Sequence, residues 1–317
     1  MIDICNKNIN QKFRELKLPF LCYDIVFKAI FTDEVDILAK MVSDITGMDY
    51  SLLENNITLE FNELPINSLK EKSKRCDFIL RIDENNILNI ELNSSYYTGL
   101  LIKNLAYLCN IFSRATKKSD RYNDDLNVVQ INLNCFEKNI SEGILEEYKI
   151  QNVKTHKTYM ENISILTLDI VKCHDIYYNE SNKEKLPNYI KWGAFIYNRD
   201  YDKIPNIIGD VISKREVKKI MDKIKKLVDD SLFMSELEKE EWAIWEENSK
   251  LEYARNEGIE QGIEQGIQQG IEQGISKGRT EEQKELILSM IKNKIDIDTI
   301  SKVTNKTVEE IKEIIKE

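Results

Sequence analysis

The feature that most constrains the fold is a short reversal of the chain over residues 76–93, where two largely apolar arms flank a polar turn. Because side chains alternate across a strand, this pattern predicts a β-hairpin with arms at 76–82 and 87–93. The face predicted to lie in the core carries Phe78, Leu80, Ile82, Leu88, Ile90 and Leu92. The hairpin therefore predicts a sheet that packs one side against a hydrophobic core.

The opposite face of the same hairpin is mostly polar. It carries Asp77, Ile79 and Arg81 on the first arm and Asn89, Glu91 and Asn93 on the second. If the turn centres on Glu84, Asp77 lies directly opposite Glu91, with the two Cβ atoms about 4.5–5.5 Å apart. Two ionised carboxylates at about 4 Å repel by about 4 kcal/mol at an effective dielectric constant of about 20, and by less in water. The pair therefore needs a compensating charge.

Three explanations fit this pair of acids. A divalent cation between them would turn the repulsion into attraction, and Mg²⁺ is commonly held by one or two carboxylates together with water and phosphate. Alternatively, both acids lie on a solvated face with Arg81 nearby, or the register shifts and they never meet. The hairpin residues alone leave all three open.

Other motifs connect the hairpin to a known family. They are Tyr23-Asp24-Ile25-Val26-Phe27-Lys28 with Phe31, Cys76-Asp77, Asn89-Ile90-Glu91-Leu92-Asn93, and Gly-Ile-Glu-Gln repeats near the C-terminus. In these motifs the chain resembles the Rpn (recombination-promoting nuclease) and putative-transposase branch of the PD-(D/E)XK nuclease superfamily. The resemblance runs from about Tyr23 to Phe136 and returns at the repeats.

This resemblance implies a fold, an activity and a set of site residues. The implied fold is α/β (α+β), a restriction-endonuclease-like mixed sheet flanked by helices, and here an all-helical region follows it. The implied activity is an endonuclease that uses Mg²⁺ or Mn²⁺ to hydrolyse phosphodiester bonds, most simply in DNA, in recombination, transposition or phage defence. Asp77 and Glu91 would hold the metal and Asp24 would lie beside it.

The sequence departs from this family at one position. The last motif residue is usually Lys, and often Gln in this branch, whereas here it is Asn93. Asn93 can orient a water molecule or a phosphate oxygen, but it carries no positive charge. We expect Lys103, on the following helix, to supply that charge. The missing lysine also favours a second hypothesis, in which a catalytically weak or inactive nuclease fold acts as an oligomeric binding or regulatory protein.

The predicted elements around the hairpin match the order that the family implies. Apolar periodicity predicts helices at 23–45 and 96–118 and strands at 56–64, 126–134, 147–153 and 163–170. The second helix is predicted to bury Leu100, Leu101, Leu105, Leu108, Ile111 and Phe112. From residue 186 onward the pattern is helical only.

A basic loop leads directly into Asp77. It contains Lys70, Lys72, Lys74 and Arg75. The net charge of −10 argues against nucleic-acid binding through the overall field, so contacts with phosphates would depend on local clusters such as this one. Its position favours phosphate contact over the alternative of a plain solvated loop.

Other chemistries find little support in the sequence. The two histidines lack the neighbours of a catalytic triad, an HExxH zinc site or an HNH nuclease, and the chain has no phosphate-binding loop or dinucleotide fingerprint. The six cysteines form no CxxC pair, which favours free thiols in a reducing compartment. With no segment of transmembrane length, we expect a cytoplasmic protein without membrane contact.

A repeat at residues 258–278 is the second unusual stretch. Glycine recurs at every fourth position from Gly258 to Gly278, isoleucine follows it at the same period, and Glu or Gln fills nearly every remaining position. Six glycines lower the stability of an isolated helix by roughly 5–6 kcal/mol relative to alanine. Close approach of a partner helix would offset this cost, so we expect a homo-oligomer joined here, with a weakly helical spacer as the alternative.

Residues 280–317 are predicted to form two or three short helices that resemble a small helix-turn-helix. Their charge is nearly balanced and slightly acidic, so a protein-contact module is favoured over a DNA reader. The predicted organisation is a nuclease-like core at 1–180, a helical cap or linker at 181–255, the repeat helix at 256–279 and this module at 280–317.

Overall fold

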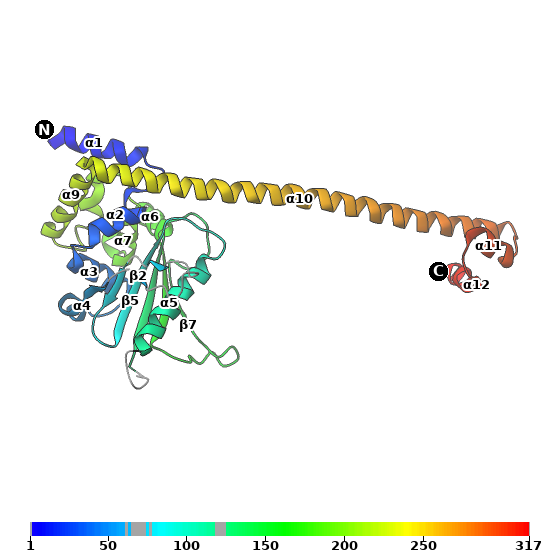
Figure 1. Ribbon diagram of the computed structural model, residues 1–317, viewed down its shortest axis with the longest axis horizontal. Helices are drawn as coiled ribbons and strands as arrows, with labels where there is room; N and C mark the ends of the chain where they lie inside the picture. Colours follow the sequence, from blue (N-terminus) through cyan, green and yellow to red (C-terminus); the bar gives the residue numbers. More distant parts are fainter. Residues whose placement is uncertain (1, 61–62, 65–73, 76–77, 118–124, 317) are drawn as a thin grey trace. The chain divides into compact units, whose positions relative to one another are not determined.

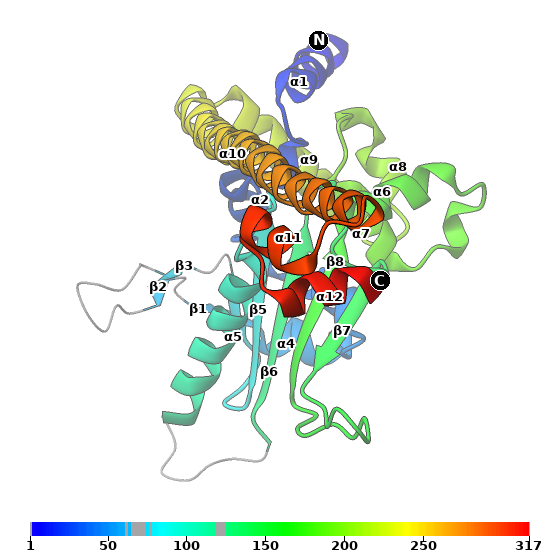
Figure 2. The same ribbon diagram turned by 90° about the vertical axis from the view of Figure 1, so that its right-hand side faces the viewer.

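The computed structural model describes residues 2–60, 63–64, 74–75, 78–117 and 125–316. It divides into two compact units, residues 1–244 and residues 245–317. Figures 1 and 2 show the helices and strands of each unit. Among the described residues, every helix is too short or too polar to cross a lipid bilayer.

The first unit is built on a mixed sheet of six strands in the order β1-β4-β5-β6-β8-β7. The strands are β1 (Thr58–Glu60), β4 (Phe78–Arg81), β5 (Asn86–Asn93), β6 (Asn127–Asn134), β7 (Leu145–Lys149) and β8 (Ile163–Asp169). Strands β5, β6 and β8 run parallel to one another, while β1, β4 and β7 are antiparallel to their neighbours. The mixed α/β fold predicted from the sequence is confirmed.

The predicted hairpin is present as β4 and β5. Phe78 lies opposite Ile90 and Ile79 lies opposite Asn89, which is the register expected from a turn at Glu84. Asp83 stabilises the turn because its Oδ1 accepts hydrogen bonds from the backbone N–H groups of Asn85 and Asn86. All six side chains assigned to the core face belong to the main hydrophobic core.

Helices cover that apolar face of the sheet and share its core. They include α2 (Asp24–Phe31), α3 (Val35–Thr46), α6 (Ile170–Asn179) and α7 (Asn188–Ile196). The core is rich in aromatic rings, such as Phe27, which contacts Phe31 at 4.8 Å and Phe78 at 5.7 Å between ring centroids. This packing fixes the strands whose other face carries the candidate site.

Helix α5 (Leu100–Lys117) covers the other face, and it buries less than the sequence predicted. Leu108 and Ile111 pack with Ile79, Ile87 and Val128 in a second, smaller core. Leu101 and Leu105, by contrast, are 63% and 50% exposed, so the prediction that both are buried was wrong. The described residues therefore cover only part of the stripe of six apolar residues.

The helix expected at 23–45 is two helices, α2 and α3, separated at Thr32–Asp33–Glu34. The two acids of this break bind another helix, since Lys219 contacts Glu34 and Lys223 contacts Asp33, both at 2.8 Å. Gly47 ends α3 in the left-handed conformation, as a glycine readily can.

Two predicted strands have different limits in the structure. Residues 56–64 divide into the end of α4 (Tyr50–Asn56), strand β1, and strand β2 (Glu63–Leu64), which pairs with β3 (Lys74–Arg75) in a separate two-stranded sheet. The strand expected at 147–153 is shifted toward the N-terminus and ends at Lys149. Strand β6 agrees with its prediction to within one residue.

The remaining elements of the first unit are helical. They are α1 (Ile2–Glu15), α8 (Ile204–Ile208), α9 (Lys214–Asp229), the start of α10 (Ser231–Lys292), and short 3-10 turns η1 (Phe20–Cys22), η2 (Lys183–Lys185) and η3 (Tyr201–Lys203). A capping box between Ser213 and Glu216 begins α9. Within the described residues no strand follows β8, as the sequence predicted.

The second unit consists of the remainder of α10 with α11 (Ile297–Thr304) and α12 (Val308–Lys316). The repeat is helical throughout, and residues 281–291 continue the same helix, so the prediction of a separate helix there was wrong. Ile287, Ile300 and Ile311 form the small core of the C-terminal module.

Candidate functional site

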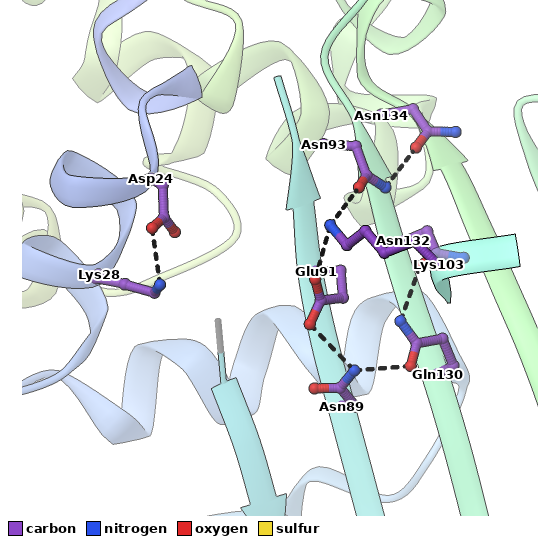
Figure 3. A network of polar contacts seen from close by, with 9 residues as sticks. All are labelled: Asp24, Lys28, Asn89, Glu91, Asn93, Lys103, Gln130, Asn132 and Asn134. Atoms are coloured by element: carbon purple, nitrogen blue, oxygen red, sulfur yellow. Dashed lines mark hydrogen bonds and ion pairs between the residues drawn. The ribbon is translucent and has the colours of Figure 1, made fainter. Parts of the chain in front are cut away.

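The face of the sheet under α5 divides into an apolar half and a polar half. Because β5 and β6 are parallel and in register, Asn89, Glu91 and Asn93 lie beside Gln130, Asn132 and Asn134. All six side chains are buried, with at most 4% of any residue exposed. Figure 3 shows them side by side at the carboxyl ends of the two strands.

Glu91 is the acid at the centre of this polar group. It is 1% exposed, and its Oε2 lies 3.2 Å from the Nζ of Lys103 on α5. Its Oε1 accepts a hydrogen bond of 3.3 Å from the side-chain amide of Asn89. A buried carboxylate is tolerated when it is paired and hydrogen-bonded, and Glu91 has both kinds of partner.

A chain of amides extends from Glu91 across the two strands. The Nδ2 of Asn89 donates to Gln130 Oε1 at 2.7 Å, and Gln130 Nε2 donates to Asn132 Oδ1 at 2.9 Å (Figure 3). The chain holds Asn89 in a fixed orientation against Glu91. The Oδ1 atom of Asn89 is buried and has no hydrogen-bond partner within the described part of the chain.

Asn93 and Lys103 complete the cluster. Asn93 donates a hydrogen bond of 3.0 Å to Asn134 Oδ1, while its own Oδ1 accepts from the Nζ of Lys103 at 3.4 Å. The single ammonium group of Lys103 therefore contacts both Glu91 and the motif residue that lacks a charge. This lysine is also half-buried, so its charge is less screened than that of a surface lysine.

Asp24, which was predicted to lie beside the metal, pairs with a lysine of its own helix. Its Oδ2 pairs with Lys28 at 2.7 Å, one turn along α2. In Figure 3 these two residues stand apart from the Glu91 cluster, and no interaction is drawn between this pair and the cluster. The Oδ1 atom of Asp24 is buried and has no hydrogen-bond partner among the described residues.

Two glutamates of α10 hold the segment that carries Asp24. Glu240 accepts hydrogen bonds from the backbone N–H groups of Asp24 and Ile25 at 2.8 and 3.1 Å, which satisfies the first turn of α2. Glu241 accepts from the hydroxyl group of Tyr23 at 2.9 Å. Burial raises the pKa of Glu240, although the two backbone hydrogen bonds oppose this shift.

Several predicted site residues cannot be placed. Asp77, Lys70 and Lys72 lie outside the described residues, and for Lys74 and Arg75 only the backbone of β3 is described. Arg81, considered as a partner of the acid pair, instead contacts Glu60 on β1 at 2.5 Å. Among the side chains that are described, no group of three or more His, Cys, Asp and Glu residues could hold a metal ion.

No role was predicted from the sequence for Gln130, Asn132, Asn134 or Asn104. Three amides at alternate positions of an otherwise apolar strand are a readable signal, because they place polar groups on one face of a buried strand. Asn104 is 3% exposed and its Oδ1 has no hydrogen-bond partner in the described part of the structure. Its signal, one asparagine on a helix, is too common to single out.

Comparison with known proteins identifies the family. PD-(D/E)XK nuclease family transposases match residues 21–254. The chain belongs to this family. The match includes β7, β8 and the helices up to the first part of α10, so the family region extends well beyond Phe136, where the resemblance was expected to pause. It ends before the glycine repeat. No curated protein and no solved structure matches the chain.

Membership of the PD-(D/E)XK nuclease family gives the Glu91 cluster its context. The Glu-Leu-Asn segment of β5, where the sequence predicted the family's motif, follows an antiparallel strand and precedes a helix. The ammonium group of Lys103 on α5 contacts both Glu91 and Asn93. The arrangement brings one acid, one cation and several amides together at the end of parallel strands.

Proposed function

We propose that this member of the family is a metal-dependent endonuclease that hydrolyses phosphodiester bonds, with DNA as its substrate. The observation that carries this proposal is Glu91, a fully buried carboxylate at the motif position of β5, held between Lys103 and Asn89. Burial of a carboxylate costs desolvation free energy even when it is paired, so the burial of Glu91 beside a cation favours a functional role.

Mg²⁺ or Mn²⁺ would be held by Glu91 together with Asp77. The donors here are carboxylate and amide oxygens, which are the ligands that these hard cations prefer, and the unpartnered Oδ1 of Asn89 is a further oxygen of this kind. The register supports Asp77 as the second ligand. Phe78, the residue after it, lies opposite Ile90, and the same register continued by one residue would pair Asp77 with Glu91. When bound, the ion would lower the pKa of a water molecule and neutralise charge on the phosphate.

The chain's own residues would then position the substrate. Lys103 would stabilise negative charge that develops on the phosphate, in place of the missing motif lysine. Asn93 would orient the attacking water or a phosphate oxygen through the amide that Lys103 and Asn134 hold. The loop with Lys70, Lys72, Lys74 and Arg75 would bind the nucleic-acid backbone, and Asp24 would act beside the metal.

The wider role that we propose is in recombination, mobile elements or phage defence, within the cytoplasm. Cys22, Cys109, Cys135 and Cys173 are free thiols, which suits a reducing compartment. Burial and contact with Cys22 hold the pKa of Cys135 well above its usual value, so this thiol stays protonated and packs as a core residue.

We also propose that the repeat at 258–278 joins copies of the chain. Around the six glycines of α10, apart from the adjoining backbone of the same helix, no described atom lies within 4 Å of the position that a Cβ would take, so the backbone is open to close approach. The isoleucines of the repeat are 50–59% exposed. A second copy of the same helix would cover both. The α11–α12 module would then serve as a protein-contact element.

Plasmid cleavage tests the nuclease directly. Supercoiled plasmid is incubated with the wild-type protein in Mg²⁺, in Mn²⁺ and in EDTA, and in parallel with the Asp77→Ala protein. We expect nicked or linear product only with the wild-type protein and a divalent ion. An Asp77→Ala protein that cuts as fast as its parent in Mg²⁺ would overturn the proposal.

One observation favours a second function, a catalytically weak nuclease fold that acts as an oligomeric binding or regulatory protein. The ammonium group of Lys103 already neutralises Glu91 at 3.2 Å, so the carboxylate has a partner without a metal ion. In that case the wild-type protein would leave plasmid intact in all three conditions while its nucleic-acid binding persisted.

A further inference from the structure

Helix α9 carries a line of lysines that belong neither to the candidate site nor to the glycine repeat. Lys214, Lys218 and Lys225 are exposed, and the structure gives them no ion pair within the described residues. At 100° per residue these three positions fall within about 40° of one another around the helix, so they share one face. At about 1.5 Å per residue they span about 16 Å along the axis.

This face of α9 borders a hollow in the first unit. The hollow has a volume of about 600 Å³, and all three lysines line it. Its floor is apolar, with Tyr201 and Pro205 from the η3–α8 segment and Met221 from α9 itself. One acid, Asp222, also lines it, so the lining carries a net positive charge in a chain whose net charge is −10.

The opposite side of α9 shows what its other lysines do. Lys219 and Lys223 bind Glu34 and Asp33 in the break between α2 and α3. Their charge serves to hold the helix against its neighbours. The lysines over the hollow make no ion pair within the described residues, although Asp222 also lines it. Of the other acids nearby in sequence, Asp202 binds Asn10 and Asp210 binds Lys191.

We infer that the α9 hollow binds the phosphate backbone of a nucleic acid. The inference rests on the proposed function, because a nuclease must hold its polyanionic substrate, and it assigns a contact surface outside the catalytic strands. Lys214 and Lys218 lie about 6 Å apart along the axis, and Lys218 and Lys225 about 10 Å apart, so the three ammonium groups are far enough apart to contact different phosphates. The apolar lining of the hollow is a surface against which the sugars and base edges can pack.

The helix offers a matched control for this inference. The groove variant is Lys214→Gln, Lys218→Gln, Lys225→Gln, and the control variant is Lys219→Gln, Lys223→Gln, Lys226→Gln. Both remove three positive charges from α9. The control residues fall within about 60° of one another on a different side of the helix, where Lys219 and Lys223 bind acids and Lys226 is exposed. Circular dichroism and thermal melting confirm that each variant is folded. Binding is measured by fluorescence anisotropy with a labelled DNA duplex of about 20 base pairs in EDTA, over a range of salt concentrations.

We expect the groove variant to bind on the order of tenfold or more weakly at about 0.1 M salt. The slope of log affinity against log salt should fall by about 2 to 3, since each phosphate contact contributes about 0.9. The control variant should lose less than one unit of slope. Equal losses in the two variants, no loss in either, or no binding by the wild-type protein would each overturn the inference.

This outcome is separable from that of the nuclease proposal. Binding in EDTA requires no catalysis, so an inactive protein whose groove variant alone loses affinity would support the groove and contradict the nuclease. Conversely, cleavage that depends on Asp77 together with equal binding by both α9 variants would support the nuclease and remove the groove.

Discussion

The β5–β6 end of the sheet buries six polar side chains, whereas the repeat of α10 leaves five isoleucines half-exposed. Polar side chains are usually exposed and apolar ones usually buried. The sheet breaks the first rule and the repeat breaks the second. In the sheet the polar groups hydrogen-bond one another, both between β5 and β6 and along β6. In the repeat the apolar groups have no neighbours within the described unit that cover them.

The difference teaches what each region is built for. A buried polar network gives up the stability of an apolar core, and such a network is retained where its groups do chemistry. Exposed isoleucines alternating with glycines give up helix stability, which a partner helix can restore. We therefore interpret the first region as a reaction site and the second as an interface, and the predictions below test that division.

The largest effect is expected at Glu91. In Glu91→Gln the side chain keeps its volume and can still accept the hydrogen bond from Asn89, but it loses its charge. We expect plasmid cleavage in Mg²⁺ to fall about 100-fold or more, with the melting temperature changed by only a few degrees. Glu147→Gln, on the exposed side of β7, is the control and should cut normally. If the Glu91→Gln protein cleaved plasmid within twofold of the wild-type rate, the polar network would have only a structural role.

Lys103 should follow with a smaller effect. Lys103→Met removes the cation from Glu91 while keeping most of the side-chain length, so cleavage should fall about 10–100-fold. Because Glu91 is then buried without its ion pair, the protein should also be less stable, and Mg²⁺ should raise its melting temperature more than it raises that of the wild type. Equal stabilisation by Mg²⁺ would show that the ion does not bind next to Glu91.

The interface is tested by adding methyl groups. Replacing the six repeat glycines by alanine favours the isolated helix by about 5 kcal/mol. If partner helices approach closely along this stripe, the same change should dissociate the oligomer, as measured by sedimentation velocity. Alanine at Gln261, Gln265, Gln269 and Gln273 is the control and should leave the mass unchanged. A wild-type protein that sediments as a monomer would contradict the interface.

The smallest effect concerns a buried acid with a structural role. The raised pKa of Glu240 means that its charged form is disfavoured in the folded protein. Its contribution is therefore most favourable below the ordinary glutamate pKa and is lost as pH rises through the higher, folded value. The stability of Glu240→Gln relative to wild type should thus improve from about pH 4 to pH 7 in thermal melts. An unchanged difference would contradict the shift.

The sequence predicted the sheet better than it predicted the helices. Alternation over 78–92 defined both the core face and the register, because a slip of one residue would have turned every apolar side chain outward. Apolar periodicity could not show where a helix stops being covered. Leu101 and Leu105 continue the stripe of Leu108, yet they are at least half exposed. The break at Thr32 likewise depends on lysines about 190 residues away.

The candidate site was only partly readable from the sequence. Glu91 and Asn93 stood out because a motif contains them, and Lys103 because it lies near the start of the next helix. The amides of β6 join the cluster only through the parallel pairing of β5 with β6, which places Gln130 beside Asn89 across 41 positions of sequence. That pairing is a property of the assembled sheet.

Calorimetric titration of Mg²⁺ into the wild-type protein and into Glu91→Gln tests the central claim most directly. The account predicts a saturable binding heat with the wild type that is lost, or weakened by tenfold or more, in the variant. The same binding heat and affinity in both proteins would contradict it, because the buried carboxylate would then hold no metal.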